Sequence, residues 1–363
     1  MTHVPAPAAV QSREFAMLRQ LRGLAILAVV IDTVLTRMND AGFLPDGRVA
    51  QVLKVIAYLT ACSGYPALLF AAGLAARAPN RAPLGHWRRW LRREWLLPLV
   101  LWTLIAAALH VAYQWAIDAP SLPSVASWLT NERPDALWFL VSVVICSVGA
   151  RVFGAIVGRR RAVIAHGVAL VVWALVSSCT MWGIVTRIGY AALFFHGGYL
   201  AASRCLPDLR VLWRWWLALT ALLLLVALAH VYRHFGVFPV TQSLPVCIAG
   251  VIAIVAMAAR RQSRAAAWMG QRWKPLYLLN GYASFVAWTA LLQTGIDDPL
   301  LQVGVALTAG MAVPLIVVRL VRRTPLFRLL GFAEHVAPLP DDATSRSAAT
   351  GDWPDDGATA KSL

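Results

Sequence analysis

The residues of this sequence that could do chemistry are polar side chains inside long apolar runs. Arg22, Asp32 and Thr33 share the first run, and His196 lies in a later one. Polar groups are costly within a bilayer, so each is a candidate for a functional role. A carboxylate or an imidazole can serve as a general base toward a hydroxyl nucleophile, a guanidinium can bind an anionic group, and a threonine can orient a substrate.

Each of these residues also has a structural interpretation. Asp32 could lie near the outer headgroup zone and pair with Arg37 or a neighbouring helix, because intramembrane acids usually have partners. A single histidine in an apolar helix, such as His196, is more often a packing residue. The other histidines in or beside apolar runs have no supporting pattern around them, and they are His110, His166, His230 and His234.

Ten apolar stretches make up most of the chain and must position these side chains. Each is close to the ~20 residues that a helix needs to cross a bilayer, and 59% of the 363 residues are hydrophobic while only 14% are charged. The stretches are continuously apolar, which favours helices over the alternating strands of a barrel. The sequence therefore predicts an all-α, polytopic integral membrane protein, with spans at residues 17–36, 53–76, 95–117, 136–157, 163–183, 188–202, 212–232, 237–258, 276–294 and 300–321.

Arginine-rich connections alternate with arginine-poor ones along the chain. Because Lys and Arg near span ends stay on the cytoplasmic side, this alternation places both termini inside and predicts a multi-pass protein of the bacterial inner membrane. It also accounts for the net charge of +16 without a nucleic-acid partner, since the charges would face membrane lipids. The expected domains are a cytoplasmic segment at 1–16, a transmembrane domain at 17–328 and a disordered cytoplasmic tail at 329–363.

Motifs for several other chemistries do not occur in the sequence. There is no phosphate loop, H-E-x-x-H, G-x-S-x-G or dinucleotide glycine fingerprint. The five cysteines fall in or beside apolar runs without a C-x-x-C pair, so neither disulfides nor a zinc site is indicated. No bound cofactor or metal is expected.

Several short segments together resemble one known family. The first run reads LRGLAILAVVIDT over residues 21–33, which resembles the opening helix of the membrane-bound acyltransferase 3 family. In that family an arginine is followed, after ten intervening residues, by a histidine considered essential for acyl transfer. Arg22 matches the arginine, whereas Thr33 stands at the histidine position. Further segments similar to the family are YPALLFAAG at 65–73, LWFL at 137–140 and FFHGGY at 194–199, and WRRWLRR at 87–93 is similar to the family's basic turn into the third helix.

The resemblance implies that an acyl group from a cytoplasmic acyl-CoA, such as acetyl-CoA, passes to a hydroxyl of an envelope glycan, exopolysaccharide or lipid. Residues eleven apart on a helix lie about 20° from the same face and ~16 Å apart along the axis, so Arg22 and Thr33 would line one channel. Threonine cannot supply a general base near neutral pH. Asp32, Thr33 and His196 are therefore the candidates around the reaction site, with Asp32 or His196 as the base.

The acyl donor would be bound by Arg22 and by a group of arginines at the cytoplasmic end of the third span. Guanidinium groups bind phosphate bidentately, so these arginines could hold the phosphates of coenzyme A. The alternative is a role in topology and lipid contact. Trp138 and Phe139 could line the substrate channel or belong to the interfacial aromatic belt. The arginine group consists of Arg88, Arg89, Arg92 and Arg93.

Two other classes of function stay open. Loss of the histidine fits a catalytically inactive family member that acts as a membrane scaffold. Arg22 and Asp32 could instead be charge-binding groups of a transporter or flippase for an envelope precursor. Transporters often contain inverted repeats or broken helices, and the sequence shows neither clearly.

Overall fold

The computed structural model describes residues 7–40, 48–116, 135–157, 168, 171–172, 183–204, 215–232, 244–260, 263–296 and 298–332. Within these ranges the chain is helical and contains no strand, which confirms the predicted all-α class. The described residues belong to one compact unit, Met1–Ala333, while the second unit, Glu334–Leu363, lies outside them.

The helices follow one another from the amino-terminal end of this unit to its carboxyl-terminal end. In chain order they are α1 (Pro7–Asp40), α2 (Arg48–Arg81), α3 (Leu84–Leu91), the π-helical turn η1 (Arg92–Leu96), α4 (Leu97–Ala116), α6 (Asp135–Val157), α8 (Gly183–Arg204), α10 (Trp215–Tyr232), α11 (Leu244–Arg260), α12 (Arg264–Gln271), α13 (Trp273–Gln293), α14 (Pro299–Val321) and α15 (Leu326–Leu329).

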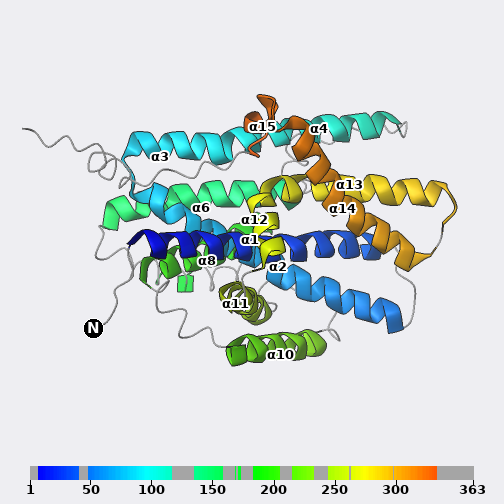
Figure 1. The fold of residues 1–363 in the computed structure, drawn as a ribbon, viewed down its shortest axis with the longest axis horizontal. Helices are drawn as coiled ribbons and strands as arrows, with labels where there is room; N and C mark the ends of the chain where they lie inside the picture. The colour runs from blue at the N-terminus through cyan, green and yellow to red at the C-terminus, as the bar shows by residue number, and fades with distance from the viewer. Residues whose placement is uncertain are drawn as a thin grey trace, which may run out of the picture. The chain divides into compact units, whose positions relative to one another are not determined.

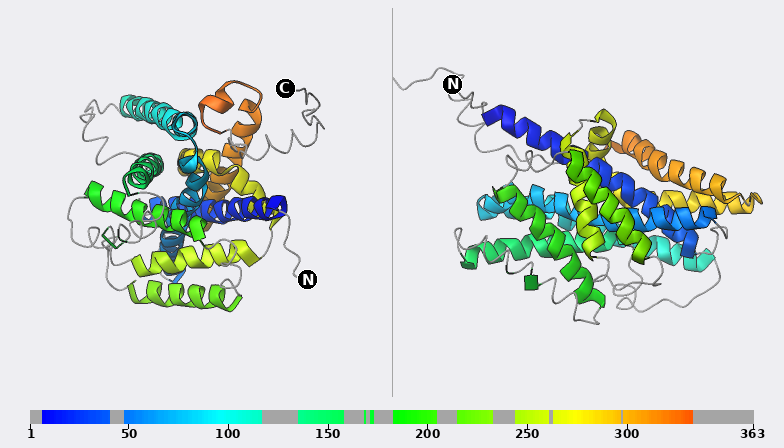
Figure 2. Two further views of the ribbon diagram at one scale, coloured as in Figure 1. Left: turned by 90° about the vertical axis from the view of Figure 1, so that its left-hand side faces the viewer. Right: turned by 90° about the horizontal axis from the view of Figure 1, so that it is seen from below.

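Helix α1 lies at the centre of the unit (Figure 1). It contacts α2, α11, α12, α13 and α14, and α2 in turn contacts α6, α8, α10 and α11. Figure 2 shows α10 and α11 packed against each other on one side of this core. Apolar side chains are buried around much of α1, which is typical of a central helix rather than a peripheral one. The helix that carries Arg22, Asp32 and Thr33 therefore packs against five other helices.

The backbones of α2 and α8 approach closely because glycines lie at their contact. A Cβ atom added to Gly198 of α8 would collide with the carbonyl oxygen of Phe70 on α2. A Cβ atom added to Gly73 of α2 would collide with the carbonyl oxygen of Phe195 on α8. Small residues at helix contacts of this kind are typical of membrane helices, where close packing drives association. These glycines fix the position of α8 against the core.

Local sequence signals set the boundaries of the last two long helices. Asp298 caps α14, since its Oδ1 accepts hydrogen bonds from the backbone N–H groups of Leu300 at 2.8 Å and Leu301 at 3.1 Å. Helix α13 ends before Gly295, which has a φ of 73°, a conformation that favours glycine. The observed helices agree within three residues with the spans expected at 276–294 and 300–321.

Three described helical stretches are long and apolar enough to cross a membrane, at Arg48–Arg77, Leu137–Ile156 and Pro299–Val321. A fourth is added if α11 and α12, which bend sharply against each other, form one broken span. These stretches support a membrane protein, while the number of ten spans and the side of the two termini stay predictions. The span expected at 163–183 lies almost entirely outside the described residues, as do the first residues of those expected at 212–232 and 237–258.

Helices α1 and α2 extend beyond the spans expected for them. Helix α1 begins at Pro7, ten residues before the expected span at 17–36, and α2 covers Arg48–Arg81 around the expected 53–76. An apolar run in the sequence marks the part of a helix that would lie in the hydrocarbon layer. The helix can continue beyond that part with polar residues. The expected cytoplasmic segment at 1–16 is thus helical from Pro7 onward.

The basic segment before the third expected span is helical rather than a turn. In α3 and η1, Trp87, Leu91 and Trp95 recur every four residues and are buried. The four arginines between them are exposed, so the segment is amphipathic, with one apolar and one cationic side. The arginines form the basic face, which consists of Arg88, Arg89, Arg92 and Arg93.

The described chain packs against the bundle as far as Phe332, four residues beyond the domain boundary expected at 328. The indole N–H of Trp102 on α4 donates a hydrogen bond to the carbonyl oxygen of Leu330 at 3.2 Å, and its ring lies 6.1 Å from that of Phe332. Gly331 has a φ of 73°, and a Cβ atom there would collide with Pro98. The rest of the expected tail lies outside the described residues.

We expect Gly198→Ala to lower the free energy of unfolding by about 1–3 kcal/mol, the usual cost of overpacking a filled interior. The matched control is Gly197→Ala, because a Cβ atom at that position meets its nearest neighbour, the ring of Phe70, at an ordinary 3.9 Å. Thermal unfolding of the detergent-purified protein measures both effects. Equal melting temperatures for the two variants would contradict the close approach of α2 and α8.

Candidate functional site

Arg22, the arginine at the family position, faces an aromatic surface formed by other helices. It is partly buried on α1, and its guanidinium carbon lies 5.5 Å from the centre of the Trp273 ring at the start of α13. A cation at this distance from an indole face is attracted by the quadrupole of the ring. Trp273 therefore helps to hold the Arg22 side chain in place.

Trp273 belongs to a group of aromatic rings that joins four elements, the aromatic cluster Trp95, Phe139, Trp273 and Tyr277 with Tyr65 at its edge. The ring of Phe139 lies 5.8 Å from Trp273, 4.9 Å from Tyr277 and 6.4 Å from Trp95. Tyr277 also contacts Tyr65 of α2 edge-on at 5.9 Å. The structure thus brings Phe139, expected in the channel, to the same aromatic cluster as Arg22, expected at the donor.

A buried ion pair connects the basic face to this cluster. Lys274 of α13 donates a hydrogen bond from Nζ to Oε2 of Glu94 on η1, and both side chains are buried. The Lys274 Nζ also lies 5.3 Å from the ring centre of Trp95 and 6.0 Å from that of Trp273. The pair ties the start of α13 to η1 and keeps Trp95 and Trp273 together.

Sequence reasoning missed this ion pair. The available signal was Glu94 itself, an acid directly after an arginine-rich run that should be purely basic by the positive-inside rule. An acid in such a run indicates a basic partner. The partner, Lys274, lies 180 residues further along the chain. No helical periodicity links positions so far apart.

The basic face lies immediately before the aromatic cluster in the chain. Its four arginines are exposed, whereas the next two residues, Glu94 and Trp95, are buried. Exposed guanidinium groups can hold phosphate groups bidentately. The element thus presents a cationic side directly beside aromatic rings that enter the bundle.

Trp138 is turned toward a different neighbour from Phe139. It is buried, and the guanidinium carbon of Arg187 on α8 lies 5.5 Å from the centre of its ring. Consecutive residues on a helix point about 100° apart. The two residues expected together in the substrate channel therefore face different parts of the bundle, Phe139 toward Trp273 and Trp138 toward α8.

Asp32 is buried among polar groups from three other helices. It is 8% exposed, and its Oδ1 accepts a hydrogen bond from Thr36 at 2.9 Å. It lies close enough to Cys62 of α2 and Tyr190 of α8 to act on both electrostatically, and Tyr190 donates a hydrogen bond to Sγ of Cys247 on α11 at 3.1 Å. Asp32 thus belongs to the bundle interior.

Arg37 and Thr33 both donate hydrogen bonds to backbone carbonyl oxygens. Arg37, the partner considered for Asp32, donates from Nη1 to the carbonyl oxygen of Gly281 on α13 at 2.7 Å. The Thr33 hydroxyl donates to the carbonyl oxygen of Val29, one turn earlier in its own helix, at 2.8 Å. A threonine bonded in this way keeps lone pairs to accept a hydrogen bond, but its proton is already in use.

His196 is buried on α8, where its ring lies 5.7 Å from that of Phe195. Tyr190, on the same helix, lies close enough to Asp32 for an electrostatic interaction. Six residues separate Tyr190 from His196, which corresponds to ~9 Å along the helix and roughly 120° around it. The two side chains therefore leave α8 at different levels and on different sides. Among the described residues, no group of three or more His, Cys, Asp or Glu is arranged to hold a metal ion.

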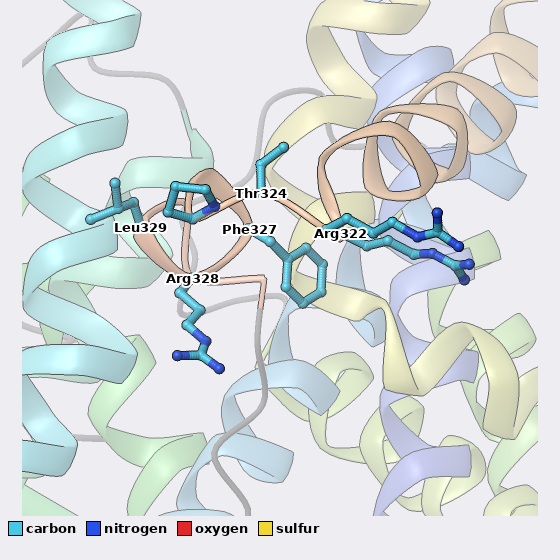
Figure 3. Close-up of a pocket in the computed structure, with 7 residues that line it drawn as sticks. Arg322, Thr324, Phe327, Arg328 and Leu329 are labelled. Carbon is cyan, nitrogen blue, oxygen red and sulfur yellow. The ribbon is translucent and has the colours of Figure 1, made fainter.

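A second basic site lies at the carboxyl-terminal end of α14. A cavity of about 480 Å³ is lined by residues of the α14–α15 connection, and Figure 3 shows Arg322 and Arg328 on opposite sides of the Phe327 ring. The arginines around it are exposed. Such a site suits lipid headgroups or other anions at the membrane surface, and it holds none of the expected site residues.

We expect Glu94→Gln and Lys274→Met each to lower the free energy of unfolding by about 3–5 kcal/mol. Each change removes one charge of the pair and leaves the opposite charge buried without compensation. The double variant should recover most of this loss, since replacing a buried pair by neutral groups is often nearly neutral. Unfolding in detergent measures the cycle, and additive losses would contradict a direct ion pair.

Comparison with known proteins agrees with the family expected from the sequence. Residues 16–319, 304 of the 363, match the acyltransferase 3 family model, which is described as an acyltransferase domain. Comparisons with curated proteins and with solved structures gave no match. A match of this length includes α1 with Arg22, the basic face and the aromatic cluster. The chain therefore belongs to the acyltransferase 3 family.

Proposed function

We propose that this protein is a bacterial inner-membrane O-acyltransferase, which passes an acyl group, in the simplest case acetyl, from acyl-CoA to a hydroxyl of an envelope glycan, exopolysaccharide or lipid. The observation that carries the proposal is the position of Arg22 over Trp273 within the aromatic cluster, in a chain of the acyltransferase 3 family. A fixed guanidinium beside aromatic walls suits a donor that has both anionic and slender apolar parts.

Donor binding would begin at the basic face. The four exposed arginines can hold the phosphates of coenzyme A, and the buried side of the same element leads to Trp95 and the aromatic cluster. Arg22 lies at this end of α1, ten residues or about 15 Å before Asp32. The acyl group would travel along this part of α1.

Transfer would take place near Asp32. The acceptor hydroxyl attacks the thioester carbonyl, the carbon–sulfur bond breaks, and the proton of the hydroxyl passes through a base to the leaving thiolate. Asp32 is a buried carboxylate on α1 that can act as this base, and its Oδ1 accepts a hydrogen bond from Thr36. Thr33 can accept a hydrogen bond from the acceptor while its own hydroxyl proton is donated to the carbonyl oxygen of Val29.

A non-catalytic scaffold is the second candidate, and the hydrogen bond from Thr33 to Val29 favours it. A threonine whose proton is donated within its own helix cannot act as a general base, which fits a family member without the reaction. In that case the fold and the membrane location are retained without acyl transfer.

We expect Arg22→Ala to reduce the yield of acyl ester by roughly 10- to 150-fold, the range for a lost hydrogen bond to a charged group. The assay is mass spectrometry of ester-linked acyl groups on envelope glycans and lipids from strains with the gene, without it, or with the variant. Arg37→Ala is the matched control, because it removes an arginine from the same helix that donates a hydrogen bond to the backbone of α13. Identical ester profiles in all strains that make the protein would favour the scaffold.

We expect Asp32→Asn to lower the rate of acyl transfer by about 10²- to 10⁴-fold, the usual contribution of a general base. Thr36→Val removes a hydrogen bond to Asp32 but keeps the carboxylate, so it should have a smaller effect. Thr33→His should preserve or raise the rate, because it adds an imidazole at the family position. Full activity of Asp32→Asn would exclude this carboxylate as the base.

A further inference from the structure

Two buried tryptophans of the aromatic cluster have indole N–H groups without an acceptor. Trp95 and Trp273 are 4% and 3% exposed, and neither Nε1 finds a hydrogen-bond partner among the described residues. Trp138, which faces α8, also lacks an Nε1 partner among the described residues, but three other buried tryptophans do have partners. Their Nε1 atoms donate to side-chain or backbone oxygens, as in Trp87 to Asn80 at 2.8 Å, Trp102 to Leu330 at 3.2 Å and Trp288 to Gln302 at 3.2 Å.

Two unsatisfied donors so close together indicate a place for an acceptor. The rings of Trp95 and Trp273 lie 6.1 Å apart, and burying an N–H without a partner costs about 1–3 kcal/mol. Both rings are held in place, Trp273 by Arg22 and Trp95 by Lys274. The protein thus maintains two oriented donors in an apolar setting and leaves them for a bound group.

The charges around the two rings indicate the chemical class of the bound group. Arg22 and Lys274 would attract an anion, but the carboxylate of Glu94 already neutralises Lys274 and would repel a phosphate. Neutral carbonyl oxygens fit better, because they accept hydrogen bonds from N–H groups without a large desolvation cost. The aromatic faces of Phe139 and Tyr277 suit a slender, largely apolar chain that bears such carbonyls.

We infer that the Trp95–Trp273 pair binds the carbonyl oxygens of the pantetheine arm of the acyl donor. The inference rests on the proposed function. It assigns to the donor's arm a contact that the donor's nucleotide does not make. The nucleotide lies on the exposed basic face, and the arm passes the two indoles beside Arg22. From there it extends along α1 toward Asp32, about 15 Å further on.

The test measures binding of two probes to the full-length protein in lipid nanodiscs by calorimetry. The probes are acetyl-CoA and adenosine 3′,5′-bisphosphate, a nucleotide that lacks the arm. We expect Trp95→Phe and Trp273→Phe each to weaken acetyl-CoA binding about 5-fold, the effect of one lost hydrogen bond of about 1 kcal/mol. Binding of the nucleotide should stay unchanged in both variants.

The matched control is Trp288→Phe, on the same helix as Trp273 and also buried, whose indole already donates a hydrogen bond to Gln302. It should bind both probes as the wild type does. If Trp273→Phe fails to fold, 3-benzothienylalanine at position 273 keeps both fused rings and replaces only the N–H by sulfur. It should show the same 5-fold loss.

The outcomes separate this inference from the proposed function. If the wild type binds acetyl-CoA and the tryptophan variants bind it equally well, the inference is wrong, the two indoles hold water alone, and the donor assignment stands. Equal losses of acetyl-CoA and nucleotide would also overturn it, because they would place the phosphates at the indoles. A wild type that binds neither probe at millimolar concentration would overturn the acyl-CoA donor and, with it, the arm contact.

Discussion

The buried ion pair between Lys274 and Glu94 is the interaction on which the candidate site depends. It joins η1 to the start of α13, two elements that are 180 residues apart in the chain. Because the neighbours of these two residues are Trp95 and Trp273, the pair also sets the distance between the two indoles. The pair gives the amphipathic basic element a direct polar connection to the helix that faces Arg22.

The arrangement separates two chemical environments along α1. Around Arg22 the surroundings are aromatic and cationic, whereas around Asp32 they consist of hydroxyl and thiol groups from α2, α8 and α11. The first environment suits recognition of a donor and the second suits movement of a proton. One straight helix connects them, so the separation follows from the sequence of α1 and does not require a hinge.

The helical class, the family and the bounds of α13 and α14 could be predicted from the sequence, because apolar runs, caps and a spaced motif are local signals. The position of Arg22 on α1 was equally predictable, but its contact with Trp273 was not. Such a contact depends on how distant helices pack, as do the Glu94–Lys274 pair and the different directions of Trp138 and Phe139. The segment from Arg88 to Arg93 was expected to be a turn because its four arginines dominate the local composition. The four-residue spacing of Trp87, Leu91 and Trp95, which is typical of a helix, is therefore easily missed.

The docking of the chain on α4 after α15 has a practical consequence for engineering the protein. Trp102 holds Leu330 and Phe332, and Gly331 fits against Pro98 only because it lacks a side chain. The last described residues of the chain are therefore anchored on α4. A reporter or affinity tag joined after Phe332 would keep that anchor, whereas a fusion made within residues 326–332 would remove the partner of Trp102 and expose its indole. The useful fusion boundary is thus set by a single tryptophan on a helix more than two hundred residues earlier.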